Sequence, residues 1–115
     1  MTAPSVLFEV QDGIATLTLN EGASLNPLKE SLQRGWLDGL QRVRDDPSIR
    51  ALIVTATGRG FCVGADLVDF KRRAAELPAG DSLGAYVGRM MDDTGNPIAQ
   101  GMRTLPVPVV CAING

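Results

Sequence analysis

The stretch best suited to chemistry in this 115-residue chain is the glycine-rich segment 57–69. It reads Thr-Gly-Arg-Gly-Phe-Cys-Val-Gly-Ala-Asp-Leu-Val-Asp and follows an apolar run of strand length, Ala51–Ala56. Its glycines allow positive φ angles and close approach of a ligand to the backbone. A helix that opens near Asp66 leaves backbone N–H groups without internal partners, and such groups favour a phosphate or a developing oxyanion. The segment predicts a binding loop, although strand, glycine turn and helix also follow one another where an α/β chain simply changes direction.

The glycine spacing differs from that of the common nucleotide-binding motifs. Gly58, Gly60 and Gly64 form GxGxxxG rather than the dinucleotide-binding GxGxxG, and no GxxxxGK[ST] is present. A fragment of a dinucleotide-binding oxidoreductase is therefore an alternative that the spacing disfavours. The chain has no histidine, which excludes histidine-activated nucleophiles within these residues. Cys62 and Cys111 lack CxxC spacing, so no metal site is expected.

Composition narrows the class of protein further. Hydrophobic residues make up 44% of the chain, charged residues make up 21%, and the net charge is −2. These values are ordinary for a globular protein and lack the basic character of nucleic-acid binders. No apolar run reaches the length of a membrane span, and the first residues do not begin a secretory signal. We expect a cytoplasmic protein that binds neither nucleic acid nor membrane.

The elements that must position the loop begin with a hairpin and a helix. Residues 6–10 and 14–19 alternate apolar and polar side chains around Gln11-Asp12-Gly13, which predicts a β-hairpin. Asn26-Pro27 predicts a helix start, with Asn26 as the N-cap. An apolar stripe at helical spacing continues this helix to about residue 44: Leu28, Leu32, Trp36, Leu40 and Val43. Gly35 and Gly39 within the helix indicate close packing of the helix on its neighbours.

Two continuous apolar runs predict the remaining strands. Ala51–Ala56 and residues 108–113 have strand length, and we expect them to be buried on both faces and paired in one mostly parallel sheet. Asn96-Pro97 repeats the signal for a helix start. The order of hairpin, helix, strand, helices and strand predicts an α/β fold, and residues 1–115 are expected to belong to a single domain.

These segments together resemble the enoyl-CoA hydratase/isomerase (crotonase) family. The match is carried by five segments in the family's order, which span the whole chain: Leu17–Asn20 ("LNRP"), Leu25-Asn26 ("LNAL"), 46–51 ("DPxVRA"), 61–67 ("FCAGADL") and 105–115 ("LPKPVIAAING"). The resemblance implies a crotonase-like spiral of ββα units. Residues 1–115 would form its N-terminal portion, which ends before the second oxyanion-hole segment.

The resemblance also implies where substrate binds. The backbone N–H of Ala65 corresponds to the first oxyanion-hole donor, which makes Ala65 the expected catalytic residue. The substrate-binding residues implied are Ser24, Leu25, Gly64, Ala65, Asp66, Leu67 and Val68. Asp66 is also expected to cap the helix that it opens. The sequence departs from the family at Glu21-Gly22, where Arg-Pro is usual, and at Val68, where many members have lysine.

The function implied is that of an acyl-CoA enzyme that stabilises a thioester enolate in an oxyanion hole. Coenzyme A thioester is then the substrate, with no further cofactor, and the full-length form is expected to be a homo-oligomer, a trimer or a dimer of trimers. In the family, the second donor and the acid/base glutamates follow the position of residue 115. The specific reaction is therefore open, and residues 1–115 alone are expected to be inactive. A non-catalytic truncated or split subunit is the alternative.

Overall fold

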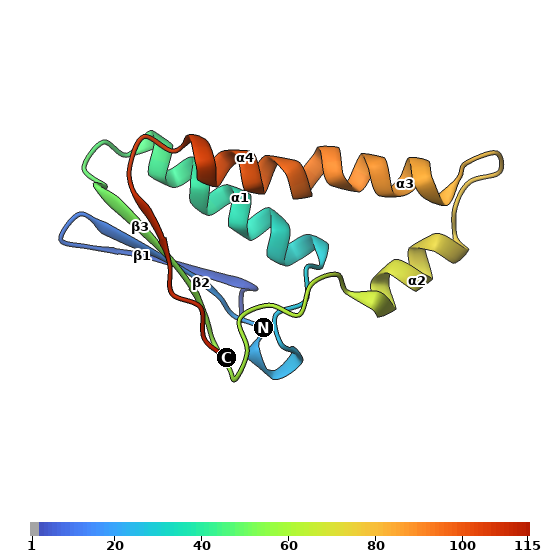
Figure 1. Ribbon diagram of the computed structural model, residues 1–115, viewed down its shortest axis with the longest axis horizontal. Helices are drawn as coiled ribbons and strands as arrows, with labels where there is room; N and C mark the ends of the chain where they lie inside the picture. The colour runs from blue at the N-terminus through green and yellow to red at the C-terminus, as the bar shows by residue number, and fades with distance from the viewer. Residues whose placement is uncertain (1–2) are drawn as a thin grey trace.

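The computed structural model describes residues 3–115 and places one four-stranded sheet against a layer of helices (Figure 1). Strands β1 (Val6–Gln11) and β2 (Ile14–Leu19) form an antiparallel hairpin. Strands β3 (Ala51–Ala56) and β4 (Val109–Cys111) then extend the sheet in parallel, in the order β1-β2-β3-β4. Both the hairpin and the parallel pairing of the two apolar runs are confirmed.

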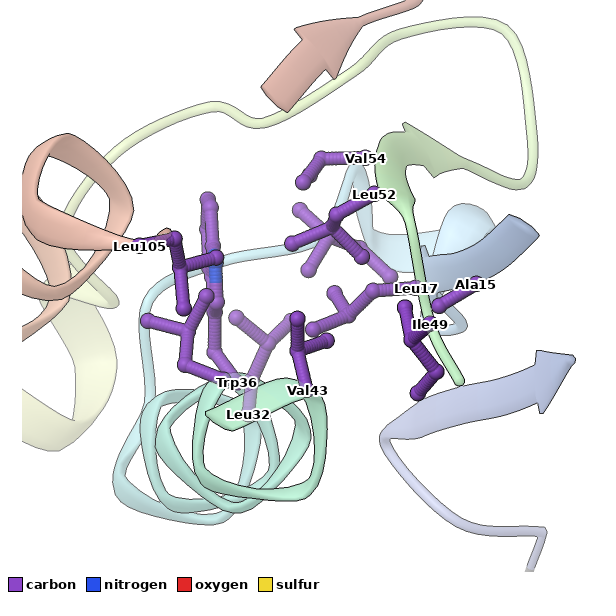
Figure 2. Close-up of a cluster of buried hydrophobic side chains, with 11 residues drawn as sticks. Ala15, Leu17, Leu32, Trp36, Val43, Ile49, Leu52, Val54 and Leu105 are labelled. Atoms are coloured by element: carbon purple, nitrogen blue, oxygen red, sulfur yellow. The ribbon is translucent and has the colours of Figure 1, made fainter. Parts of the chain in front are cut away.

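Helix α1 (Glu30–Asp45) supplies one side of the core. Its apolar stripe faces alternate side chains of β2 and β3, as Figure 2 shows for the buried cluster. The buried apolar residues are Ala15, Leu17, Leu19, Leu32, Trp36, Leu40, Val43, Ile49, Leu52, Val54 and Leu105. A Cβ on Gly39 would lie 2.5 Å from Cδ1 of Leu17, and one on Gly35 would lie 2.9 Å from the side chain of Val6. The close packing predicted at these two glycines is confirmed.

A long helical rod lies beside α1 and ends above the sheet (Figure 1). It consists of α3 (Leu83–Met90), a π-helical segment (Met91–Gly95) and α4 (Asn96–Thr104). Packing of α4 on α1 includes the contact of Trp36 Nε1 with Met102 Sδ at 3.4 Å.

The helix start predicted at Asn96-Pro97 is confirmed in part. Helix α4 begins at Asn96 with Pro97 in its first turn, but Asn96 is not an N-cap, because the rod continues through it with helical φ and ψ. Proline has no N–H, and its ring collides with the carbonyl of the preceding helical turn. The π-helical segment, which ends at Gly95, opens the turn that precedes Pro97, and π-bulges are one of the ways in which helices accommodate such a disturbance.

The predicted helix start at Asn26-Pro27 is wrong. Helix α1 begins at Glu30, and its N-cap is Lys29, whose side chain makes no capping bond. Asn26 has φ +51°, and its side chain is buried beneath neighbouring loops instead of facing a helix terminus. The side-chain amide of Asn26 bonds to those loops, so it does not cap the helix.

Burial on both faces, predicted for the two apolar strands, is wrong as well. In β3, Leu52 and Val54 are fully buried, while Ile53 between them is only half-buried. Strand β4 is shorter than predicted, and Val110 in it is 58% exposed. The reason is that the helices lie on one face of the sheet only, where α1 packs on the strands and α4 packs on α1. In residues 3–115 no helix is both long enough and apolar enough to cross a membrane.

Candidate functional site

The candidate site lies where the loops after β2 and β3 meet. The two strands are parallel, with Leu19 opposite Ala56, so their carboxyl ends share one edge of the sheet. The N–H of Thr57 donates to the carbonyl of Leu19 at 2.9 Å, which carries the pairing into the loops. Ligands of open α/β sheets bind at such carboxyl ends.

Beyond the sheet, the two loops run side by side as a short ladder. The N–H of Val63 donates to the carbonyl of Leu25 at 2.9 Å, and the N–H of Leu28 donates to the carbonyl of Gly64 at 2.7 Å. Leu28 and Ala65 form the corresponding parallel bridge. The segment around Ala65 is therefore held by backbone bonds although it lies outside the main sheet.

The Ala65 N–H is an oriented donor without an internal partner. Within residues 3–115, no backbone or side-chain atom accepts a hydrogen bond from it. The peptide between Gly64 and Ala65 is trans, so its N–H points opposite to the Gly64 carbonyl that Leu28 holds. Gly64 has φ +95°, and nothing lies within 4 Å of where its Cβ would be, so backbone conformation rather than space favours glycine there. This arrangement can donate to a carbonyl or an oxyanion.

The helix after this donor is capped by its own side chain. Oδ1 of Asp66 accepts from the N–H groups of Val68 at 3.1 Å and Asp69 at 3.3 Å, at the start of α2 (Leu67–Ala75). The predicted capping role of Asp66 is confirmed. Because the carboxylate already occupies these two donors and adds negative charge, the helix start itself is a poor site for an anion.

An open cleft of about 570 Å³ borders the donor. It is lined by Ser24, Pro27, Lys29, Val63, Ala65, Asp66, Leu67 and Val68. Five of the seven residues implied by the resemblance therefore meet in one cleft, and Gly64 and Leu25 border it through the backbone ladder. Leu67 and Val68 are 75% and 80% exposed, so the wall that they form is apolar and uncovered.

Sequence reasoning missed three lining residues, Pro27, Lys29 and Val63. Val63 is 60% exposed and could have been noticed as the apolar residue directly before Gly64. Lys29 lies in a segment that was predicted to be helical, so its place in the cleft depends on the later start of α1. Lys29 also pairs with Glu21 across the loop after β2.

Sequence reasoning also missed the role of Asn26, which is fully buried beneath the site. Its Oδ1 accepts from the N–H of Glu21 at 2.6 Å, and its Nδ2 donates to the carbonyls of Thr57 at 3.0 Å and Gly60 at 3.4 Å. The sequence signal that was available is that asparagine tolerates a left-handed backbone better than most residues do.

Ion pairs hold α2 in place beside the cleft. Asp69 accepts from Arg72 at 2.5 Å and from Arg73 at 3.0 Å, and Arg73 also reaches Glu30 of α1 at 3.0 Å. The hydrogen bond from Arg72, together with the weaker effect of Arg73, lowers the pKa of Asp69 and outweighs partial burial. Asp69 is thus held as a paired carboxylate and is poorly suited to proton transfer.

Comparison with known proteins identifies relatives of this chain. A family model described as "Enoyl-CoA hydratase/isomerase" matches residues 9–115. The chain is 37% identical over 110 residues to the 1,2-epoxyphenylacetyl-CoA isomerase of Escherichia coli, covering 96% of this chain and 40% of that protein. It is 32% identical over 116 residues to an enoyl-CoA hydratase of Mycobacterium tuberculosis, covering 99% of this chain and 40% of that protein.

Solved structures agree with the sequence comparison. An enoyl-CoA hydratase/isomerase from Mycobacterium paratuberculosis superposes with a TM-score of 0.78 at 32% identity, over 98% of this chain and 42% of that one. The predicted crotonase-like α/β fold is confirmed. The chain spans about 40% of the length of the curated relatives that it matches.

Proposed function

The chain belongs to the enoyl-CoA hydratase/isomerase family, and from this premise we propose that it acts on an acyl-CoA thioester, donating the Ala65 N–H to the thioester oxygen. One observation carries the proposal. This N–H has no acceptor within residues 3–115, and it borders an open cleft on a peptide that Leu28 holds in place.

The proposed chemistry is stabilisation of an enolate. Removing a proton beside a thioester carbonyl, or adding a nucleophile to its conjugated double bond, places negative charge on the carbonyl oxygen. A donor that is already oriented stabilises that charge without reorganising during the reaction. The apolar side chains of Val63, Leu67 and Val68 beside the cleft would lower the local polarity around the acyl group and strengthen the bond.

The proposal is restricted to the step that hydratases and isomerases have in common. The relatives carry both names, and no carboxylate beside the donor is assigned as the acid or the base. Asp66 caps α2, and Asp69 is held by two arginines. We further propose that the reaction needs no cofactor, that the whole protein is a cytoplasmic homo-oligomer, and that its subunits associate as a trimer or a dimer of trimers. These points rest on the family resemblance.

Amide NMR of the ¹⁵N-labelled protein tests the role of Ala65 directly. Titration with a four-carbon 2-enoyl-CoA should move the Ala65 N–H proton downfield, because a hydrogen bond deshields the proton. Free coenzyme A, which lacks the carbonyl, should leave that resonance in place. The Ala85 N–H, which donates to Ser82 Oγ at 3.0 Å, serves as an internal reference. Binding of the thioester without movement of the Ala65 signal would contradict the proposal.

A further inference from the structure

We infer that Asn26 is a positioning residue, which sets the direction of the Ala65 N–H without touching the ligand. The inference rests on the proposed function, because it concerns the orientation of the same donor. It follows from three linked observations: the burial of Asn26, the backbone conformation at residues 25 and 26, and the ladder between the two loops.

Asn26 joins the two loops through all the polar atoms of its side chain. It is 0% exposed, its Oδ1 accepts from Glu21 in the loop after β2, and its Nδ2 donates to Thr57 and Gly60 in the loop after β3. A buried amide in an apolar environment would be costly, and this one is hydrogen-bonded at both ends. Removing the Asn26 side chain would therefore break the hydrogen bonds by which it links the two loops.

The backbone beside this side chain has a conformation that needs support. Leu25 has φ +63° and Asn26 has φ +51°, so two consecutive non-glycine residues are left-handed. Leucine is disfavoured there because its Cβ approaches the following carbonyl, and such conformations persist only where their surroundings enforce them. The bonds of the Asn26 side chain, with the N–H of Asn26 donating to the carbonyl of Glu21 at 3.0 Å, supply that support.

This turn brings the following backbone against the donor segment. Within the turn, the carbonyl of Leu25 accepts from the N–H of Val63. Two residues after Asn26, the N–H of Leu28 donates to the carbonyl of Gly64. The second bond fixes the plane of the Gly64–Ala65 peptide and, with it, the direction of the Ala65 N–H. It also polarises that peptide, which makes its N–H a stronger donor. Asn26 thus acts on Ala65 through two backbone bonds.

Two ligands that differ only at the carbonyl separate positioning from general stability. Acetyl-CoA has the thioester oxygen, whereas S-ethyl-CoA is the thioether without it, and calorimetry measures both affinities. The native protein should prefer acetyl-CoA about fivefold, the effect of one net hydrogen bond. In Asn26→Gly, which keeps the left-handed backbone at little cost, the preference should fall to about one while the affinity for S-ethyl-CoA stays within about twofold.

Two further variants complete the test. Val43→Ala, in the buried core of α1 and outside both loops, should lower the thermal midpoint and keep the fivefold preference. Asn26→Asp keeps the size of the side chain and its acceptor atom but cannot donate to Thr57 and Gly60. Asn26→Asp should also lose the preference for acetyl-CoA over S-ethyl-CoA. If the glycine variant does not fold, Asn26→Asp replaces it in the test.

The outcomes distinguish the two hypotheses. A native protein with no preference for acetyl-CoA would contradict the proposed function itself. A native preference that survives unchanged in the folded Asn26 variants would refute the positioning role and leave the proposed function standing. Loss of the preference in Val43→Ala as well would show that it tracks stability, and this too would overturn the inference.

Discussion

Gly22 lies so close to Thr57 that a Cβ on it would be 2.7 Å from the carbonyl carbon and oxygen of Thr57. The N–H of Gly22 donates to Oγ1 of Thr57 at 3.2 Å. Gly58 is equally close to Gly22, since a Cβ on Gly58 would lie 2.7 Å from Cα of Gly22. The loops after β2 and β3 are therefore in direct backbone contact beneath the candidate site, at a position that admits no side chain.

Gly22→Ala should consequently destabilise the protein by about 1–3 kcal/mol, the usual cost of overpacking where the neighbours cannot move. Gly88→Ala is the matched control, because nothing lies within 4 Å of the Cβ position of Gly88 in α3. The control should stabilise by about 0.4–1 kcal/mol, through helix propensity and a less flexible unfolded chain. Urea unfolding monitored by circular dichroism compares the two. Equal effects of both variants would contradict the close contact.

Ala65→Pro should remove the proposed donor and reduce turnover of a short 2-enoyl-CoA by the whole enzyme about a hundredfold or more. Ala65→Ser keeps the N–H, and because Ala65 is exposed its side chain has room, so this variant should be mildly affected. Steady-state kinetics of both variants beside the native enzyme make the comparison. Equal activity of the native and proline forms would exclude the assigned role.

Leu40→Ala should cost about 2–5 kcal/mol, because Leu40 is fully buried between the sheet and α4. A Cβ on Gly101 of α4 would lie 2.9 Å from Cδ1 of Leu40, so the cavity would open directly beneath α4. The neighbouring exposed residue gives the control, since Gln41→Ala should change stability by less than about 0.5 kcal/mol. Chemical denaturation of both variants measures the difference, and a cost below that of Gln41→Ala would mean that α4 does not pack there.

Local patterns predicted the elements better than they predicted the site. The hairpin, the two parallel strands and the stripe on α1 follow from side-chain periodicity, which records which face of an element is buried. The Asp66 cap was predictable because it bonds to residues two and three positions along the chain.

Neither asparagine of the two Asn-Pro pairs is the predicted N-cap, because tertiary structure decides between competing uses of the same residues. Asn26 bonds to Thr57 and Gly60, which are distant in sequence, and Asn96 lies inside a rod whose π-helical segment accommodates Pro97. Likewise, Lys29 reaches the cleft only because α1 begins after it. The spacing of residues along the chain does not predict those contacts, and only the structure reveals them.

The stability that Asp69 contributes to the folded protein should be lost as the pH falls into the acid range. Its hydrogen bond from Arg72, with the further bond from Arg73, lowers the pKa of Asp69 in the folded protein below its ordinary value of 3.8. A carboxyl group whose pKa is lower when folded stabilises the native state above the pKa of the unfolded chain. That stabilisation is lost as the pH falls through the folded pKa.

Asp69→Asn should therefore be less stable than the native protein at neutral pH, by at most about 1 kcal/mol because the ion pairs are partly exposed. The difference should stay constant from about pH 6 to pH 8 and shrink once the pH falls below about 4, where the unfolded carboxyl is protonated. Thermal midpoints across this range measure it, and added salt should reduce it at neutral pH. The exposed Asp92, which makes no ion pair within residues 3–115, gives the control variant Asp92→Asn, which should change stability at neutral pH by less than about 0.5 kcal/mol. A difference that persists or grows toward pH 3 would show that Asp69 does not stabilise the attachment of α2 through its charge.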